Sequence, residues 1–153
     1  MKIFLLIAGL IVLSAFAVQS QSHEHTFDSI QARKLGADKY GMKSYYFALL
    51  KTGSFVTTDK AVRDSLFRGH MNNISRLADA GKLVVAGPFG KNDLNYRGLF
   101  ILNTSSKTEA DSMMLSDPAI ASHLFEVELV PWYGSAALPV YLEVHKKIAA
   151  ENP

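Results

Sequence analysis

Residues 60–88, KAVRDSLFRGHMNNISRLADAGKLVVAGP, carry a helix pattern followed directly by a strand pattern. Apolar side chains recur at helical spacing on both sides of His70, at Val62, Leu66, Ile74 and Leu77. Residues 57–59 supply capping side chains before this stripe, and Gly81 stands where a helix commonly ends. The apolar run 83–88 ends at Pro88, which has no N–H to donate. The stretch predicts a helix over 60–80 and a strand over 83–88.

The flanking sequence predicts three further strands and a second helical region. Residues 45–50 (YYFALL) and 97–102 (RGLFIL) are short apolar runs, and 125–130 (FEVELV) alternates like a strand with one polar face. We expect residues 131–134 to close that last strand. Ser106 and Glu109 form a capping box for a helix that continues to 115, and Asp117 is the expected N-cap of a helix that begins at Pro118. Residues 138–153 are expected to add a short amphipathic helix.

The order strand, helix, strand, strand, helix, strand predicts an α+β, ferredoxin-like βαββαβ fold. It has a four-stranded antiparallel sheet with both helices on one face. The residues expected on the other, bare face are Phe47 or Tyr46, Val84 or Val85, Phe100 and Val127. An apolar sheet face of this size is rarely left in water. We therefore expect a second copy to pack sheet against sheet, which gives a homodimer built as a dimeric α+β barrel.

The N-terminal region has the three parts of a secretory signal. A positive start at Lys2 precedes an apolar run from Ile3, and small residues follow at Ala15 and Ala17. The run is shorter than the roughly 20 apolar residues of a membrane-spanning helix, although an uncleaved anchor is the alternative. We expect residues 1–20 to be a signal peptide and the mature protein to be periplasmic or secreted, with no membrane attachment after cleavage. Residues 21–43 are then a flexible linker, 44–138 the folded domain and 139–153 a C-terminal extension.

The composition excludes several classes of site. The chain has no Cys, so disulfides, thiol catalysis and Cys-ligated metals are excluded. Its 16 basic and 14 acidic residues are mixed along the sequence, so neither a nucleic-acid stripe nor a polybasic membrane patch is present. His23 and His25 are only two metal ligands near a terminus, and we predict no metal site. We expect no cofactor, because no glycine-rich nucleotide motif occurs.

Several short motifs occur in order between residues 45 and 138. They are 69–71 (GHM), 86–89 (AGPF), 97–101 (RGLFI), 116–119 (SDPA) and 126–132 (EVELVPW). Together they resemble the YCII-related (YciI-like) domain family. The resemblance implies a dimeric α+β barrel and a site pair formed by His70 and Asp117. It also implies that a few relatives eliminate chloride from hydroxylated rings, while most have no established activity. Ser122 and His123 depart from the pattern, because many relatives have a small residue or glycine there.

Each candidate site residue has a functional and a structural interpretation. His70 is an acid–base group or a core residue, and Asp117 is its partner or only a helix cap. Three candidates for substrate binding are Arg97, as an anion holder, Asn73, one turn from His70, and Trp132, as a pocket wall. Their structural alternatives are a solvated strand end, a polar helix flank and a cover for the barrel end or dimer seam.

The residue types favour proton transfer over covalent catalysis. No Ser occurs in a Gly-x-Ser-x-Gly context, so acyl transfer through a nucleophile is not expected. A His–Asp pair supports proton abstraction next to a carbonyl. The first hypothesis is a cofactor-independent lyase or isomerase that acts on a small, cyclic, oxygenated compound. The alternatives are a non-catalytic small-ligand-binding or accessory module, and a domain that uses its open sheet to bind a different protein.

Overall fold

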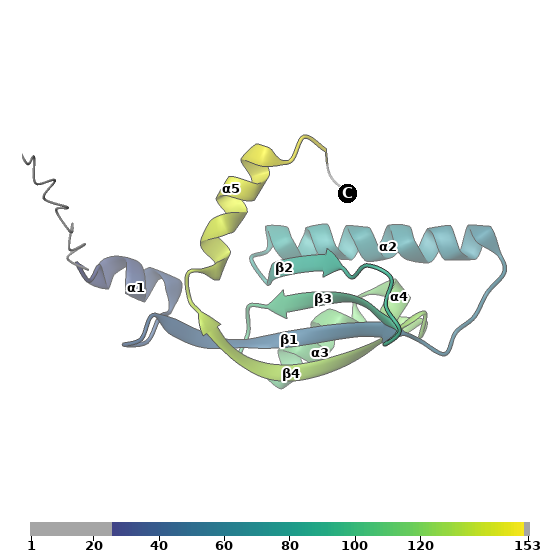
Figure 1. Cartoon of the computed structure of the whole chain (residues 1–153), viewed down its shortest axis with the longest axis horizontal. Coiled ribbons are helices and arrows are strands. Elements are labelled where there is room, and N and C mark those ends of the chain that lie inside the picture. Colours follow the sequence, from purple (N-terminus) through teal and green to yellow (C-terminus); the bar gives the residue numbers. More distant parts are fainter. Residues whose placement is uncertain (1–25, 152–153) are drawn as a thin grey trace, which may run out of the picture.

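The computed structural model describes residues 26–151 (Figure 1). Its elements are α1 (Ser29–Leu35), β1 (Met42–Thr52), α2 (Lys60–Asp79), β2 (Leu83–Pro88), β3 (Tyr96–Leu102), α3 (Lys107–Leu115), α4 (Pro118–Ala121), β4 (Phe125–Ser135) and α5 (Tyr141–Ile148). A short 3-10 turn, η1 (Leu138–Val140), precedes α5. Within the described part of the chain, no helix is long and apolar enough to cross a membrane.

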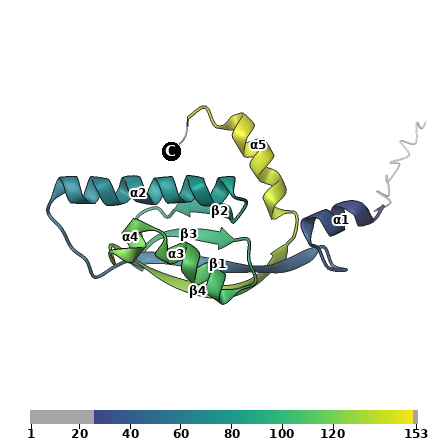
Figure 2. The same cartoon turned by 180° about the vertical axis from the view of Figure 1, so that it is seen from behind.

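The four strands form one antiparallel sheet in the order β2-β3-β1-β4. Helices α2, α3 and α4 lie on the same face of this sheet, behind it in Figure 1 and in front of it in Figure 2. The strand order and the placement of the helices confirm the predicted α+β, ferredoxin-like arrangement.

The hydrophobic core lies between the sheet and these three helices. Its buried members are Tyr46, Ala48, Leu50, Leu77, Leu83, Phe100, Leu102, Ala110, Met113, Met114, Ala119, Ile120 and Phe125. Burying a large apolar side chain contributes about 1.5–3 kcal/mol. Because the chain has no Cys, this burial stabilises the fold without disulfides.

Helix α2 begins and ends where the sequence predicts. The side chain of Asp59 accepts the N–H groups of Ala61 and Val62, at 2.8 and 3.3 Å. At the other end, Gly81 follows the helix with a φ of 67°, a left-handed conformation that glycine adopts without strain. The buried side chains of α2 include His70, which the apolar stripe had placed towards the sheet.

Strand β4 is longer than predicted. The expectation that residues 131–134 close the strand is wrong, because β4 continues to Ser135 and pairs with β1 along its whole length. Pro131 itself lies opposite Tyr46. Proline is tolerated here because β4 is an edge strand, where a missing N–H need not interrupt the ladder.

Helix α1 was not predicted. The sequence predicts a flexible linker over residues 21–43, whereas Ser29–Leu35 form a helix and β1 already begins at Met42. Asp28 caps α1 by accepting the N–H groups of Ile30 and Gln31, at 3.0 and 2.9 Å. Helix α1 is short, and its large apolar residues Ile30 and Leu35 are five residues apart, so the sequence shows no apolar stripe there. The predicted signal peptide and the pair His23 and His25 lie outside the described residues.

The register identifies which residues lie on the sheet face opposite the helices. Directly opposite residues share a face, and Phe47 lies opposite both Ile101 and Val130. The sequence leaves open whether Phe47 or Tyr46 faces away from the helices. Phe47 does so, and Tyr46 belongs to the core. The expectation for Phe100 and Val127 is wrong, because both lie on the core side. Side chains alternate along a strand, so a shift of one residue moves a side chain to the other face.

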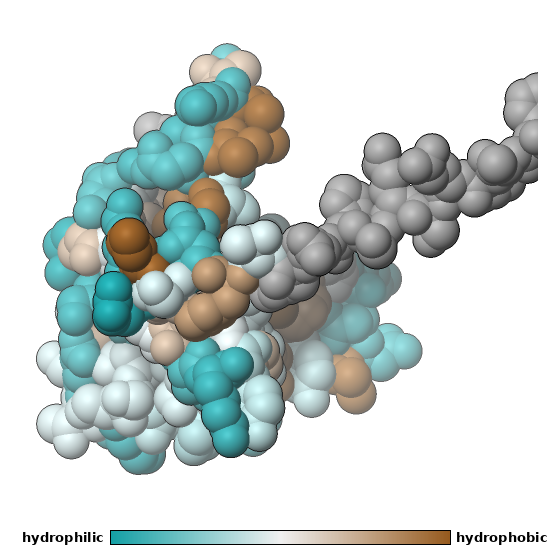
Figure 3. Space-filling view, turned by 90° about the vertical axis from the view of Figure 1, so that its left-hand side faces the viewer, coloured by the Kyte–Doolittle hydropathy of each residue, from teal (hydrophilic) through white to brown (hydrophobic). Residues whose placement is uncertain are grey.

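The C-terminal segment contacts the sheet through Tyr141. Tyr141 in α5 donates its hydroxyl hydrogen to the carbonyl oxygen of Val84 at 2.5 Å. Tyr45 and Val84 are both buried although neither belongs to the main core cluster. Helix α5 itself is expected from the sequence and is confirmed. Its exposed large apolar side chains are Tyr141, Val144 and Ile148. Figure 3 shows hydrophobic surface near the top of the molecule, where α5 lies in Figure 1.

Candidate active site

Two separate elements bring His70 and Asp117 into contact. His70 lies on α2, and Asp117 is the N-cap of α4. Nδ1 of His70 is 2.7 Å from Oδ2 of Asp117. His70 is 8% exposed and Asp117 is 0% exposed. The two residues predicted as a pair therefore form a buried histidine–carboxylate contact.

The approach of α2 to α4 depends on the residues beside this pair. Gly69 precedes His70 and Pro118 follows Asp117. A Cβ added at Gly69 would lie only 2.7 Å from Cγ of Pro118. The glycine and the proline ring thus pack against each other where His70 meets Asp117, which gives a steric reason for a glycine in the Gly-His motif.

Four donors hold the carboxylate of Asp117. Oδ1 accepts the N–H groups of Ala119 and Ile120 at 2.9 and 3.4 Å, while Oδ2 accepts from His70 and from Nδ2 of Asn73, the latter at 3.4 Å. Burial by itself raises the pKa of Asp117. The hydrogen bond and charge of His70, with the N–H of Ala119, outweigh burial and bring the pKa below its ordinary value of 3.8. Asp117 is therefore ionised at neutral pH, and it is a helix cap and the partner of His70 at once.

The carboxylate decides which nitrogen of the neutral imidazole ring carries the proton. Because ionised Asp117 only accepts hydrogen bonds, Nδ1 of His70 is the donor and the lone pair is on Nε2. None of the described residues forms a hydrogen bond with Nε2. Every fully buried side-chain nitrogen or oxygen in this part of the chain has a partner, and the His70 side chain keeps 10% exposure. Nε2 is thus the ring atom that is free to meet a ligand.

Aromatic side chains enclose the ring of His70. Phe100 in β3 stacks on it, with 5.9 Å between centroids and 28° between planes. Phe125 in β4 meets the ring at 5.3 Å and 64°, and Phe67 meets Phe125 edge-on at 5.7 Å. The sequence did not identify these three residues as part of the site. The position of Phe67 three residues before His70, on the same helix face, is the signal that could have found it.

Asn73 lies at the site and forms hydrogen bonds within it. Its amide donates to Asp117, and its Oδ1 accepts from Nη2 of Arg76 at 2.6 Å. Asn73 is 5% exposed. Its contacts therefore support the acid–base pair, and substrate binding by Asn73 stays a prediction. Arg76 and Ser116 are joined by a 2.8 Å hydrogen bond, and no sequence motif indicates that they belong to the site.

Arg97 is near the site without touching it. Its Nε donates to Oγ1 of Thr52 at 2.7 Å, and Thr52 lies opposite Phe125, which packs on His70. Arg97 is exposed. The guanidinium is therefore at the same end of the sheet as His70, and an anion-binding role for Arg97 stays a prediction.

The structure does not bring Trp132 to His70, and in this chain Trp132 does not line the site around that ring. Phe125 packs on His70 from the core side, and Trp132 is seven residues further along an unbroken β4 ladder. An odd separation along a strand puts the two side chains on opposite faces. Trp132 instead lies opposite Tyr45, with 5.7 Å between the ring centroids.

His123 occupies a strained position next to α4. Its φ is 60°, in the left-handed region, and it follows Ser122, the C-cap of α4. Glycine adopts this conformation without steric cost, whereas other residues pay for it. The positive φ gives a physical reason why a glycine would suit this position.

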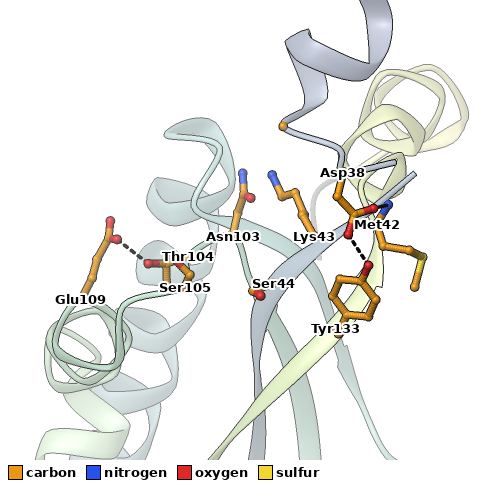
Figure 4. Close-up of a pocket in the computed structure, with 10 residues that line it drawn as sticks. Asp38, Met42, Lys43, Ser44, Asn103, Thr104, Ser105, Glu109 and Tyr133 are labelled. Atoms are coloured by element: carbon orange, nitrogen blue, oxygen red, sulfur yellow. Dashed lines mark hydrogen bonds between the residues drawn. The ribbon is translucent and has the colours of Figure 1, made fainter. Parts of the chain in front are cut away.

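Two cavities in the described residues lie away from His70. One is an open cavity of about 560 Å³ at the start of β1, lined by Asp38, Lys43, Ser44, Asn103, Ser105 and Tyr133 among others (Figure 4). Ser44 pairs with Tyr133 at this end of the β1–β4 ladder, whereas Phe125 is at the opposite end. The other, of about 400 Å³, lies between α3 and β4. Residues 26–151 contain no cluster of three or more His, Asp or Glu side chains suited to a metal ion.

The comparisons with known proteins find similarity to solved structures but not to a family model or a curated sequence. No family model and no curated protein sequence matches the chain. A solved structure of 5-chloro-2-hydroxyhydroquinone dehydrochlorinase from Burkholderia phenoliruptrix, in complex with 2,5-dihydroxybenzoquinone, is 22% identical, with a TM-score of 0.39. The match covers 57% of this chain and 90% of that one. The resemblance to the YCII-related family therefore stays a prediction.

Proposed function

We propose that this protein is a cofactor-independent acid–base enzyme, a lyase or isomerase, that acts on a small, cyclic, oxygenated compound. His70 is the general base and Asp117 is its partner. The observation that carries the proposal is the 2.7 Å contact between the two side chains in a buried setting, with no described residue bonded to Nε2. Buried titratable pairs of this kind concentrate at functional sites.

The chemistry follows from the tautomer of the ring. Nε2 takes a proton from a substrate carbon next to a carbonyl group, and the imidazolium that forms is stabilised by Asp117. The electron pair of the broken C–H bond forms a carbon–carbon double bond. In an elimination the leaving group departs with its own bonding pair, and in an isomerisation His70 returns the proton to another carbon. Both outcomes balance without an oxidant or a reductant.

The aromatic side chains around His70 favour a ring-shaped substrate. Phe67 is 44% exposed and contacts Phe125, which packs on the His70 ring. An apolar ring would gain area burial and edge-to-face contacts against Phe67. Oxygen substituents on the same ring would reach Arg97 or remain in water.

The test is turnover of small lactones and halogenated hydroxy-compounds by the purified protein and its variants. General acid–base catalysis contributes about 10²- to 10⁴-fold, so His70→Gln is expected to lose at least about 100-fold of kcat. The matched control is His145→Gln, a histidine on the exposed face of α5. Turnover that His70→Gln leaves unchanged would refute the proposed role of His70.

A non-catalytic ligand-binding module is the second candidate. It is favoured by the few polar groups at the ring, since His70 contacts Phe100 and Phe125 on two sides. Calorimetric titration separates the two functions. A binding module would bind a ring compound without converting it, and Phe67→Ala would weaken that binding in proportion to the lost apolar area.

We also propose that the protein forms a homodimer through the open sheet face. Val130 and Trp132 on this face are 44% and 38% exposed, and apolar sheet faces of this kind are commonly covered by a partner. Val130→Asp is expected to give a monomer in light scattering at low micromolar concentration. Val56→Asp, at a loop position that is 85% exposed, is the matched control and should leave the mass unchanged. A wild-type monomer would contradict the proposal.

We propose further that the chain is an exported member of the YCII-related family. The motifs around His70 and Asp117 support family membership, and the pattern of residues 1–20 supports export. The intact mass of the protein recovered from an expression host tests the second point. Loss of about 20 N-terminal residues is expected, and a full-length chain retained in the cell would contradict export.

A further inference from the structure

A chain of hydrogen bonds leads from Asp117 to the surface of α2. Arg76 donates from Nη2 to Oδ1 of Asn73 at 2.6 Å, and Nδ2 of Asn73 donates to Oδ2 of Asp117 at 3.4 Å. The same Oδ2 accepts from Nδ1 of His70. We infer that Arg76 tunes the proton affinity of His70 through Asn73 and Asp117. The inference rests on the His70–Asp117 pair proposed above.

The direction of the Asn73 amide follows from its two partners. A guanidinium group only donates hydrogen bonds, so the oxygen of Asn73 must face Arg76. The NH₂ group is then left for the carboxylate of Asp117, which only accepts. Ser116 holds Arg76 in place, because its Oγ accepts from Nη2 at 2.8 Å and donates to the carbonyl oxygen of Met113 at 2.7 Å.

Arg76 affects the proton affinity of His70 through Oδ2 of Asp117, which His70 and Asn73 both contact. Oδ2 of Asp117 divides its negative charge between the His70 ring and the Asn73 amide. The charge of Arg76 polarises that amide, because hydrogen bonds in a chain strengthen one another. Asp117 is then a weaker partner for the imidazolium, and the proton affinity of His70 falls. The Asn73 contact is longer than the His70 contact, 3.4 against 2.7 Å, so we expect tuning and not replacement of the His70 bond.

The other elements packed on the ring offer no competing charge among the described residues. Asp117 at the start of α4 is the ion that contacts His70, while β3 and β4 present Phe100 and Phe125. The functional consequence is direct. A weaker contact between Asp117 and the imidazolium favours the neutral ring, whose Nε2 lone pair accepts the proton.

The experiment is an NMR titration of the His70 ring in the full-length mature protein. Arg76→Met removes the charge at an exposed position, so the variant should fold. It is expected to raise the pKa of His70 by about 0.3–1 unit, a typical response to a changed neighbouring charge. Arg76→Lys restores a charge and should return the titration towards that of the wild type. The matched control is Arg68→Met, two residues from His70 on the same helix and exposed, which should change the pKa much less.

A double mutant distinguishes an effect through the hydrogen bonds of Asn73 from direct repulsion between the charges of Arg76 and His70. If Arg76 acts through Asn73, the pair Arg76→Met and Asn73→Ala will shift His70 no further than Asn73→Ala alone. Additive shifts would overturn the inference, as would a lowered pKa in Arg76→Met or a shift no larger than that of Arg68→Met. Asp117→Asn tests the proposed function separately. If that change leaves the titration of His70 as in the wild type, the pair itself fails, whatever Arg76 does.

Discussion

Replacing Gly69 with alanine should destabilise this protein, although the same change usually stabilises a helix. Alanine in a helix interior is more favourable than glycine by about 0.8–1.0 kcal/mol. At Gly69, however, the new Cβ would lie 2.7 Å from Cγ and 3.2 Å from Cβ of Pro118. The proline ring cannot rotate away, so α4 must move as a unit. Overpacking of this kind costs about 1–3 kcal/mol, which leaves a net loss of about 1 kcal/mol.

The assay is urea unfolding followed by circular dichroism. With a slope of about 1–3 kcal/mol per M for a small domain, a loss of about 1 kcal/mol lowers the midpoint by about 0.3–1 M. Gly90→Ala is the control, because its Cβ would meet nothing within 4 Å and its φ is not left-handed. That variant should stay within about 0.5 kcal/mol of the wild type.

The NMR signal of His70 tests whether the clash with Pro118 in Gly69→Ala also disturbs the candidate site. Movement of α4 also moves Asp117 away from His70, so the Nδ1 proton signal of His70 should weaken or shift in Gly69→Ala. Pro118→Ala removes the obstacle, and Gly69→Ala should cost less in that background. A Gly69→Ala protein as stable as the wild type would refute the account of how α2 and α4 meet.

Two further predictions concern the same end of the fold. His123→Gly should raise the free energy of unfolding by up to about 1 kcal/mol, because His123 holds a φ of 60° that glycine adopts freely; urea unfolding measures it, and a loss of stability would show that the His123 side chain matters more than its backbone. The pKa of Asp117 is lower in the folded protein than its ordinary value of 3.8. As the pH falls towards 3.8, the Asp117 carboxylate therefore takes up a proton in the unfolded chain before it does so in the folded protein. The stabilisation by ionised Asp117 is lost over this range. The difference in unfolding free energy between the wild type and Asp117→Asn should therefore be largest above about pH 5 and shrink towards pH 3; a difference that is constant with pH would contradict the lowered pKa.

Local patterns in the sequence were sufficient for most of the fold. The helix at 60–80 was predictable because capping residues, a 3.6-residue apolar stripe and Gly81 all indicate the same boundaries. The strand at 83–88 was predictable because an apolar run stops at Pro88. Helix α1 is not predictable because its large apolar residues, Ile30 and Leu35, do not recur at helical spacing. The end of β4 is predicted too early because a proline in an edge strand resembles a strand end.

Part of the candidate site is predictable from the sequence, and part depends on the tertiary structure. The sequence placed His70 on the inward stripe of a helix and Asp117 at a helix N-cap, since both positions follow from short-range spacing. Only the tertiary structure joined them at 2.7 Å, enclosed the ring with Phe100 and Phe125, and separated Trp132 from it by the thickness of a sheet. The physical reason is that the spacing of residues along the sequence sets the face of a helix on which a side chain lies. Contact between His70 and Asp117, 47 positions apart, depends instead on how closely α2 and α4 pack. The contact of Gly69 with Pro118 sets the distance between these two helices.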